Sequence, residues 1–251
     1  LGMTWPKQYG GHERTSMERY VVTEELLAAG APVSAHWVAD RQSGPMILKS
    51  GTEAQKQAIL PRIAAGECYF AIGMSEPDSG SDLASLRTTA TKVVGGYKIN
   101  GRKIWSSGAH FCHYMIATVR TGGARDDTNR HEGLSQFLVD LKGPGIEIRG
   151  IRNMAGDVHF NETVFDDAFV PEDCLLGAEG DGWRNVTSEL GLERSGPERF
   201  LSSTITLTEA ARRIGETPND SQALALGQIT ARLKALRRMS LGVSALLQEG
   251  E

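Results

Sequence analysis

The stretch FAIGMSEPDSGSDLAS, residues 70–85, decides the fold of this chain. A short apolar run that favours a strand stops at a Ser-Glu-Pro turn, and a loop rich in serine and glycine follows. Backbone amides, hydroxyls and a glycine without a side chain let an anionic or flat polar ligand approach closely. The stretch therefore predicts a strand that ends in a ligand-binding loop.

A second segment of related character follows at residues 101–108, with the sequence GRKIWSSG. It is typical of a strand, and it carries the indole of Trp105 with two hydroxyl groups directly after it. We predict that the first segment holds a phosphate or thioester ligand and that the second faces an aromatic ring system.

Together these segments resemble the acyl-CoA dehydrogenase family of flavoenzymes, and further similarities run in order from about residue 5 to residue 200. They are WPKQYGG at 5–11, GTEAQK at 51–56, FDDAFVP at 165–171, GDGW at 180–183 and LER at 192–194. The resemblance also implies that the chain is a fragment lacking parts of both ends of a typical member.

The resemblance implies an α+β fold with three parts: a helical N-terminal domain at 1–67, a central β domain at 68–177 and a helical-bundle C-terminal domain at 178–251. The residues agree with helices at both ends. Ser16 is expected to cap a first helix that ends near Gly30. Thr52 and Gln55 predict a capping box for a helix reaching residue 65, with a kink or break at Pro61.

Strand signals dominate the middle of the chain. The predicted strands lie at 89–94 and 97–100, around a Gly95-Gly96 hairpin turn, and at 114–119, 134–139, 146–149 and 162–165. Strands this close together, without helices between them, favour an antiparallel barrel or sandwich. The polar loop at 122–132 is predicted to be exposed and mobile.

The helical pattern resumes near Gly182 and becomes regular toward the end of the chain. Apolar residues from Leu226 to Leu247 recur at steps of three and four, close to a heptad. This spacing predicts the seam of a long helix that packs against other helices.

Composition excludes several classes of protein. The 251 residues carry a net charge of −4, which argues against a nucleic-acid-binding protein. No apolar run approaches the roughly 20 residues that span a bilayer, and no secretory signal is visible. Cys68, Cys112 and Cys174 are far apart and have no metal-ligand spacing, so we predict no metal site and a reducing, cytoplasmic location.

The resemblance implies FAD as the cofactor. The residues carried over to the flavin are Ile72, Met74, Ser75, Gly80, Ser81, Trp105, Ser106 and Ser107, and Ser81 would also meet the substrate. The family often has threonine where this chain has Ser75 and Ser107, and many members have a larger or more polar residue than Ile72.

The implied reaction is α,β-dehydrogenation of an acyl-CoA thioester, in which a base takes the α-proton and flavin N5 takes the β-hydride. Glu193 matches the helix position that some members use for this base, and Arg194 is expected to support substrate binding or the helix interface. The base could instead lie in a segment that this chain lacks, or there could be none. Glu76 and Asp78 are interpreted as turn and capping residues, and Asp82 as a cap of the segment that follows.

The resemblance further implies a role in lipid metabolism and β-oxidation, a homo- or heterotetramer, and an electron-transfer flavoprotein or similar acceptor. Two alternatives remain open at this point. The chain could be a non-catalytic partner subunit of a heteromeric acyl-CoA dehydrogenase, or it could be a flavin-dependent monooxygenase of the same fold.

Overall fold

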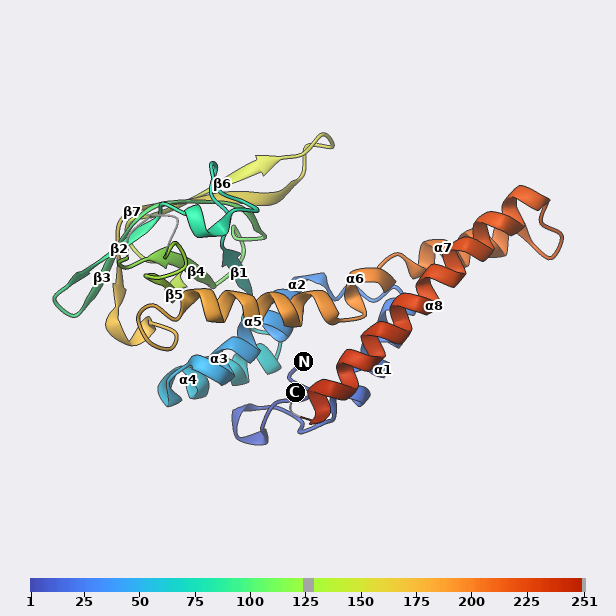
Figure 1. Cartoon of the computed structure of the whole chain (residues 1–251), viewed down its shortest axis with the longest axis horizontal. Coiled ribbons are helices and arrows are strands. Elements are labelled where there is room, and N and C mark those ends of the chain that lie inside the picture. The colour runs from blue at the N-terminus through green and yellow to red at the C-terminus, as the bar shows by residue number, and fades with distance from the viewer. Residues whose placement is uncertain (124–128, 250–251) are drawn as a thin grey trace. The chain divides into compact units, whose positions relative to one another are not determined.

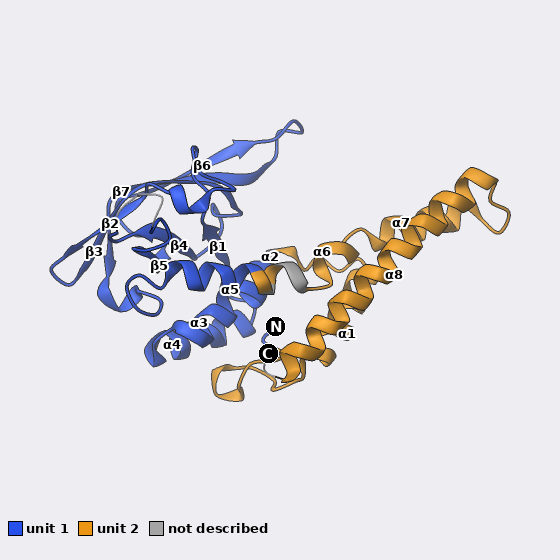
Figure 2. Cartoon of the chain, viewed as in Figure 1, with its two compact units in different colours: residues 1–2, 35–190 blue, residues 3–34, 191–251 orange. Residues whose placement is uncertain are grey.

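The computed structural model describes residues 1–123 and 129–249, apart from the side chains at positions 35, 192, 194 and 195. The chain forms two compact units, shown in Figure 2. The first comprises residues 1–2 and 35–190, and the second comprises residues 3–34 and 191–251. The division into domains at 1–67, 68–177 and 178–251 stays a prediction.

A curled seven-stranded sheet forms most of the first unit (Figure 1). The strands are β1 (Phe70–Gly73), β2 (Thr89–Val93), β3 (Gly96–Ser107), β4 (Tyr114–Arg120), β5 (Leu134–Asp140), β6 (Ile146–Arg152) and β7 (Val158–Pro171). The order along the sheet is β1-β4-β2-β3-β7-β6, and β5 pairs with β4. All the predicted strands are present, and the segments predicted at 97–100 and 101–108 form one strand, β3, which ends at Ser107.

The sheet is mostly antiparallel, as predicted, but its first strand is not. β1 pairs in parallel with β4, from Phe70 opposite Tyr114 to Gly73 opposite Ala117. A single parallel pair also joins Thr89 to Arg120. Parallel neighbours need a long connection instead of a hairpin, and here the chain between β1 and β4 provides one.

The first hairpin turns one residue earlier than the glycine pair suggested. Val93 pairs with Gly96, so the two turn residues are Val94 and Gly95. Gly95 has φ of +81°, which a side chain would disfavour, while Gly96 already belongs to β3. Residues 124–128 of the loop predicted to be mobile lie outside the described part of the chain.

The core of the first unit lies between the strands. The rings of Tyr97 and Phe137 meet edge to face at 4.8 Å near its centre. A second apolar cluster joins the sheet to the start of α5 (Gly182–Ser195), where Val186 packs with Leu83, Leu86 and Leu134. The helix begins at the residue that the sequence predicted, and this cluster fixes its first turns against the strands.

In the first unit, three α-helical segments precede the sheet. They are α2 (Ser34–Val38), α3 (Gly44–Ser50) and α4 (Glu53–Ala64), with a π-helical turn at Ala39–Ser43. The capping box of Thr52 and Gln55 is confirmed. The prediction of a break at Pro61 is wrong, because α4 continues past this residue to Ala64. The proline removes one backbone donor, and the buried side chains of Ile59 and Ile63 hold the last turn in place.

The second unit is helical. It contains α1 (Ser16–Ala28), α6 (Glu198–Leu201), α7 (Thr204–Ile214) and α8 (Asp220–Glu249), and α1 contacts the other three. Arg237 forms a bidentate ion pair with Glu24, at 2.6 and 2.8 Å. The long final helix was predicted, but much of its apolar seam, including Ile229 and Leu236, is exposed in this chain.

The start of the chain differs from the helical expectation. Within the first 15 residues the only helical element is a 3-10 turn at Lys7–Tyr9, because Pro6 and Gly10 interrupt the pattern. The cap of α1 is Thr15 and not Ser16, since Thr15 accepts from the amide of Glu18 in a complete capping box.

Two features of the described residues bear on function. None of their helices has the length and apolar character needed to cross a membrane. None of their histidine, cysteine, aspartate and glutamate side chains gather into a group that could hold a metal ion.

Candidate functional site

The two segments singled out in the sequence lie side by side. The amide of Ile104, in β3, donates a 2.9 Å hydrogen bond to the carbonyl oxygen of Ser75, just beyond β1. Lys103 reaches the same stretch and donates from Nζ to the carbonyl oxygen of Met74 at 3.1 Å. The predicted neighbourhood of the hydroxyl-rich loop and the indole-bearing strand is therefore present in the structure.

Trp105 is presented outward by a local irregularity of β3. The pairing with β7 shifts between Lys103 and Ser106, and Trp105 has φ of +61°. A left-handed conformation costs a residue with a side chain roughly 1–2 kcal/mol, so the position is strained. The indole is 56% exposed and meets the ring of Phe160 edge to face at 5.9 Å. The bulge thus places an exposed aromatic surface near the C-terminal end of β3.

The two serines after Trp105 point to different surroundings. Ser107 is exposed, whereas Ser106 is only 1% exposed. The Ser106 hydroxyl has no hydrogen-bond partner among the described residues, and its carbonyl oxygen accepts from Nδ2 of Asn161 at 3.0 Å. Alternation along the strand turns the Ser106 side chain inward, so Ser107 is the serine whose hydroxyl shares the outer face with Trp105.

The residues predicted on the first segment run from the sheet to the surface. Ile72, Met74 and Ser75 are half-buried, and Gly80 and Ser81 are exposed. The described part of the chain offers the Ser75 hydroxyl no hydrogen-bond partner. A Cβ added to Gly80 would meet no heavy atom within 4 Å, so packing within this chain does not require glycine there. The space beside Gly80 is open to a ligand.

The turn between these residues is closed by the protein itself. Glu76 and Ser79 exchange backbone hydrogen bonds of 2.7 and 3.1 Å, and the Ser79 hydroxyl donates to the carbonyl oxygen of Asp82 at 2.6 Å. The prediction that Asp82 caps the next segment is wrong in detail. Its carboxylate bonds the Ser85 hydroxyl and Arg130 instead of a backbone amide.

Sequence reasoning missed Lys103, which forms a buried ion pair with Glu76 at 2.8 Å. Glu76 also accepts from the amides of Arg87 at 2.6 Å and Thr88 at 2.9 Å, which confirms its predicted capping role. One sequence signal could have indicated that Lys103 is buried. Lys103 is four residues from Ile99, which is buried on the same strand, and residues four apart share one face of a strand.

Burial and charge act in opposite directions on this pair. Burial opposes ionisation of Glu76, but the Lys103 ammonium and the hydrogen bonds outweigh it, so the pKa of Glu76 is lowered from 4.5. Burial also lowers the pKa of Lys103 from 10.5 to about 8, against the opposing effect of Glu76. Glu76 therefore stays a carboxylate at neutral pH and is a poor candidate for a general base.

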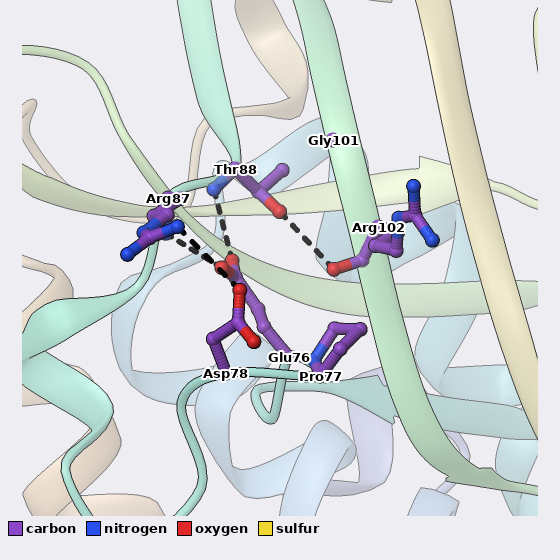
Figure 3. A pocket seen from close by; sticks show the side chains of 7 residues that line it. All are labelled: Glu76, Pro77, Asp78, Arg87, Thr88, Gly101 and Arg102. Atoms are coloured by element: carbon purple, nitrogen blue, oxygen red, sulfur yellow. Dashed lines mark hydrogen bonds and ion pairs between the residues drawn. The ribbon is translucent and has the colours of Figure 1, made fainter.

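A pocket of about 400 Å³ opens beside this pair (Figure 3). Its lining comprises Glu76, Pro77, Asp78, Arg87, Thr88, Gly101 and Arg102. Asp78 and Arg87 form an exposed ion pair at 3.5 Å, and the Thr88 hydroxyl donates to the carbonyl oxygen of Arg102 at 3.4 Å. The polar groups of this lining largely bind one another, and no sequence pattern predicted the pocket.

The predicted base and its neighbour lie on the last turns of α5, which belong to the second unit. The Glu193 side chain is 20% exposed and pairs with Arg199 at 3.2 Å. Arg199, which follows on α6, was also missed from the sequence. The prediction for the side chain of Arg194 falls outside the described part of the structure.

Family models match two successive parts of the chain. The model of the acyl-CoA dehydrogenase N-terminal domain covers residues 1–67, and that of the acyl-CoA dehydrogenase middle domain covers residues 71–168. The chain belongs to the acyl-CoA dehydrogenase family. The second match contains the whole of the Ser75–Trp105 neighbourhood.

Similar proteins of this family are known from mycobacteria. Acyl-CoA dehydrogenase FadE29 of Mycobacterium tuberculosis is 38% identical over 92% of this chain and 60% of its own length. Acyl-CoA dehydrogenase IpdE1 of Mycolicibacterium smegmatis is 34% identical over 98% of this chain and 66% of its own length. The chain thus spans about two thirds or less of these relatives.

Solved structures show the same fold. The ChsE4-ChsE5 complex from Mycobacterium tuberculosis is similar with a TM-score of 0.83 at 32% identity, over 98% of this chain and 65% of the matched chain. The Tcur3481-Tcur3483 steroid ACAD is similar with a TM-score of 0.86 at 31% identity, over 100% of this chain and 65% of the matched chain. The α+β architecture inferred from the sequence is therefore confirmed.

Proposed function

We propose that the protein binds FAD and dehydrogenates an acyl-CoA thioester between its α and β carbons. The observation that carries this proposal is the outward-facing indole of Trp105 beside the unpartnered hydroxyl of Ser75. An aromatic face and a hydroxyl at neighbouring strand ends suit a flat ring with one polar edge.

The residues present fit the cofactor. Trp105 and Ser107 share the outer face of β3, where a ring can lie against them. Gly80 and Ser81 border open space on the adjoining loop and would hold phosphate groups through amides and a hydroxyl. Ile72 and Met74 would line the ring. Ser106 would contribute through its backbone, because its side chain faces inward.

Bound FAD would supply the acceptor for the hydride, and the protein would supply the rest. Glu193 is the carboxylate proposed to take the α-proton, and its pairing with Arg199 at 3.2 Å holds it in one orientation. Ser81, and Arg194 by its place in the family pattern, are proposed to bind the thioester. Electrons would then leave to an electron-transfer flavoprotein or a similar acceptor.

The test is a flavin titration of the complete protein. We expect it to bind FAD, to turn yellow, and to lose its yellow flavin absorbance when an acyl-CoA is added without oxygen. The thioester panel includes short, branched and steroid side-chain acyl groups, because one similar structure is that of a steroid ACAD. A protein that stays colourless when FAD is supplied would refute the proposal.

The role of Glu193 has its own variant. Glu193→Gln should keep FAD binding and abolish bleaching, while Glu209→Gln, which removes an exposed carboxylate paired with Arg212 and Arg213, should keep both. Full bleaching by Glu193→Gln would place the base elsewhere.

A second candidate function is that of a partner subunit in a heteromeric acyl-CoA dehydrogenase. It is supported by two similar structures whose names each pair two proteins, ChsE4-ChsE5 and Tcur3481-Tcur3483. In this case no thioester would bleach the flavin of the isolated protein. Bleaching would appear only when a second acyl-CoA dehydrogenase chain co-purifies with it. Turnover by a homo-oligomer would exclude this role.

A further inference from the structure

Lys103 is a buried cation directly behind the candidate flavin site. Its side chain has no exposed surface, although lysine is rarely buried in proteins. Gly73 makes room for it, since a Cβ at that position would lie 3.3 Å from Lys103 Cγ and 2.4 Å from the Met115 sulfur. An ammonium group in such a place is retained only when its hydrogen bonds are satisfied.

Two acceptors satisfy Lys103, and both lie on the segment that follows β1. Nζ donates to Glu76 Oε1 at 2.8 Å and to the carbonyl oxygen of Met74 at 3.1 Å. Glu76 is anchored in turn by the amides of Arg87 and Thr88. The Glu76 carboxylate therefore supplies the charge opposite to Lys103. The Met74 carbonyl is the acceptor through which Lys103 contacts the backbone of the candidate site.

The Met74 carbonyl belongs to the same planar peptide as the Ser75 amide. In a trans peptide the C=O and N–H groups point in opposite directions, so an orientation imposed on one is imposed on the other. Ile104 holds the next carbonyl, that of Ser75, at 2.9 Å. Two successive carbonyls are thus fixed from the β3 side, which turns the Ser75 amide away from Lys103.

We propose that Lys103 is a positioning residue that, through the Met74 carbonyl, aims the Ser75 amide and hydroxyl at the polar edge of the bound flavin. Glu76 serves as its charge partner and keeps the ammonium group in the interior. The inference rests on the proposed flavin site, and it assigns to the pair a role beyond holding the fold together.

Three variants of the complete protein separate positioning from folding. Lys103→Met removes the hydrogen-bond donor and leaves the buried Glu76 carboxylate without its opposite charge. Lys103→Met with Glu76→Gln removes both charges and keeps a side chain able to accept from the Arg87 and Thr88 amides. Lys98→Met is the matched control, because Lys98 lies on the same strand in an exposed ion pair with Asp167.

We measure thermal unfolding of the FAD-free protein, FAD affinity by flavin fluorescence, and the reduction potential of the bound flavin. The double variant should unfold close to the parent temperature, yet bind FAD about tenfold more weakly and shift the flavin potential, because a hydrogen bond from a charged donor is lost. Lys98→Met should change none of the three. Lys103→Gln, which keeps a shorter donor, should fall between the parent and the double variant.

Parent affinity and potential in the double variant, at parent stability, would show that Lys103 is only structural. Should the double variant fail to fold, Lys103→Gln is compared with the parent, and an unchanged affinity and potential there overturns the proposal. The proposed function fails separately, when the parent itself binds no FAD.

A cycle with Ser75→Ala adds an independent check. If Lys103 acts through Ser75, the losses of FAD affinity from Ser75→Ala and from the Lys103→Met/Glu76→Gln pair should combine to less than their product. Fully multiplicative losses would mean that Lys103 does not act through the Ser75 hydroxyl, and the hydroxyl would be removed from the proposal.

Discussion

The ammonium group of Lys103 lies 2.8 Å from Glu76 Oε1, at a place where the two side chains are 0% and 6% exposed. Each charge is tolerated in the interior because the other is present, and each also bonds to backbone groups. A single neutralisation therefore removes more than one favourable contact. It leaves an uncompensated charge without access to water.

Loss of the Glu76 charge should destabilise the protein strongly. We expect Glu76→Gln to lower the free energy of unfolding by about 3–5 kcal/mol at pH 7, which is the usual cost of a stranded buried charge. Urea unfolding followed by circular dichroism measures it. The exposed pair Lys98–Asp167 is the comparison, and Asp167→Asn should cost no more than about 1 kcal/mol. Equal effects at the two sites would show that burial of the Lys103–Glu76 pair is energetically unimportant.

Acid should weaken the protein through the same carboxylate. The pKa of Glu76 is lower in the folded protein than its ordinary 4.5, despite burial, because of Lys103 and the amide hydrogen bonds. Its contribution is therefore complete above pH 4.5 and is lost as the pH falls through the folded-state pKa. Between pH 7 and pH 3 the free energy of unfolding should fall less steeply for Glu76→Gln than for the parent. Parallel curves would contradict this assignment.

Alkaline pH should act through the buried thiols. Burial raises the pKa of Cys112 from 9.0 to about 12 and that of Cys174 to about 11. Above pH 9 the unfolded chain releases thiol protons that the folded chain retains. The contribution of these thiols to the free energy of unfolding is therefore fully present below pH 9 and is lost as the pH rises. For Cys112 the loss is about 1 kcal/mol at pH 10. Cys112→Ala should flatten this slope, whatever its effect at neutral pH.

Thiol labelling checks the same burial directly. The three cysteines are unpaired, and Cys68 and Cys112 are buried. A thiol reagent at pH 8 should therefore modify them slowly in the native protein and rapidly in denaturant. Rapid native labelling of Cys112 would place it at the surface and remove the reason for its raised pKa.

The strained conformation of Trp105 makes a prediction that separates backbone from side chain. Trp105→Gly should leave the unfolding free energy of the FAD-free protein within about 1 kcal/mol of the parent, because glycine adopts φ of +61° without strain. Trp105→Val should unfold more easily than Trp105→Gly by roughly 1–2 kcal/mol, since a β-branched residue disfavours that region. Both variants should lose flavin affinity if the indole faces the ring. Unchanged affinity would remove Trp105 from the proposed site.

Local signals in the sequence predicted local structure well. The capping box of Thr52 and Gln55, the turn at Gly95 and the start of α5 at Gly182 each depend on residues a few positions apart, and the structure contains all three. Where a local rule failed, a neighbour competed with it. Thr15 caps α1 in place of Ser16, and buried contacts stabilise the part of α4 that follows Pro61.

The candidate site was only partly visible in the same way. The sequence marked Ser75 and Trp105 because hydroxyls, glycine and an indole are chemically conspicuous at strand ends. It did not mark Lys103 or Arg199, because a lysine in a strand or an arginine near a helix looks like an ordinary surface residue. Their partners, Glu76 and Glu193, are known only once the chain has folded.

By itself, the sequence determined the family, the order of helices and strands, and the two segments that make up the candidate flavin site. Tertiary structure alone decided that β1 runs parallel to β4, that Ser106 turns inward while Trp105 and Ser107 turn outward, and that a buried lysine holds the Met74 carbonyl. The reason is physical. Strand register, burial and ion pairing are set by free energies of contact between residues distant in sequence, which no local pattern contains.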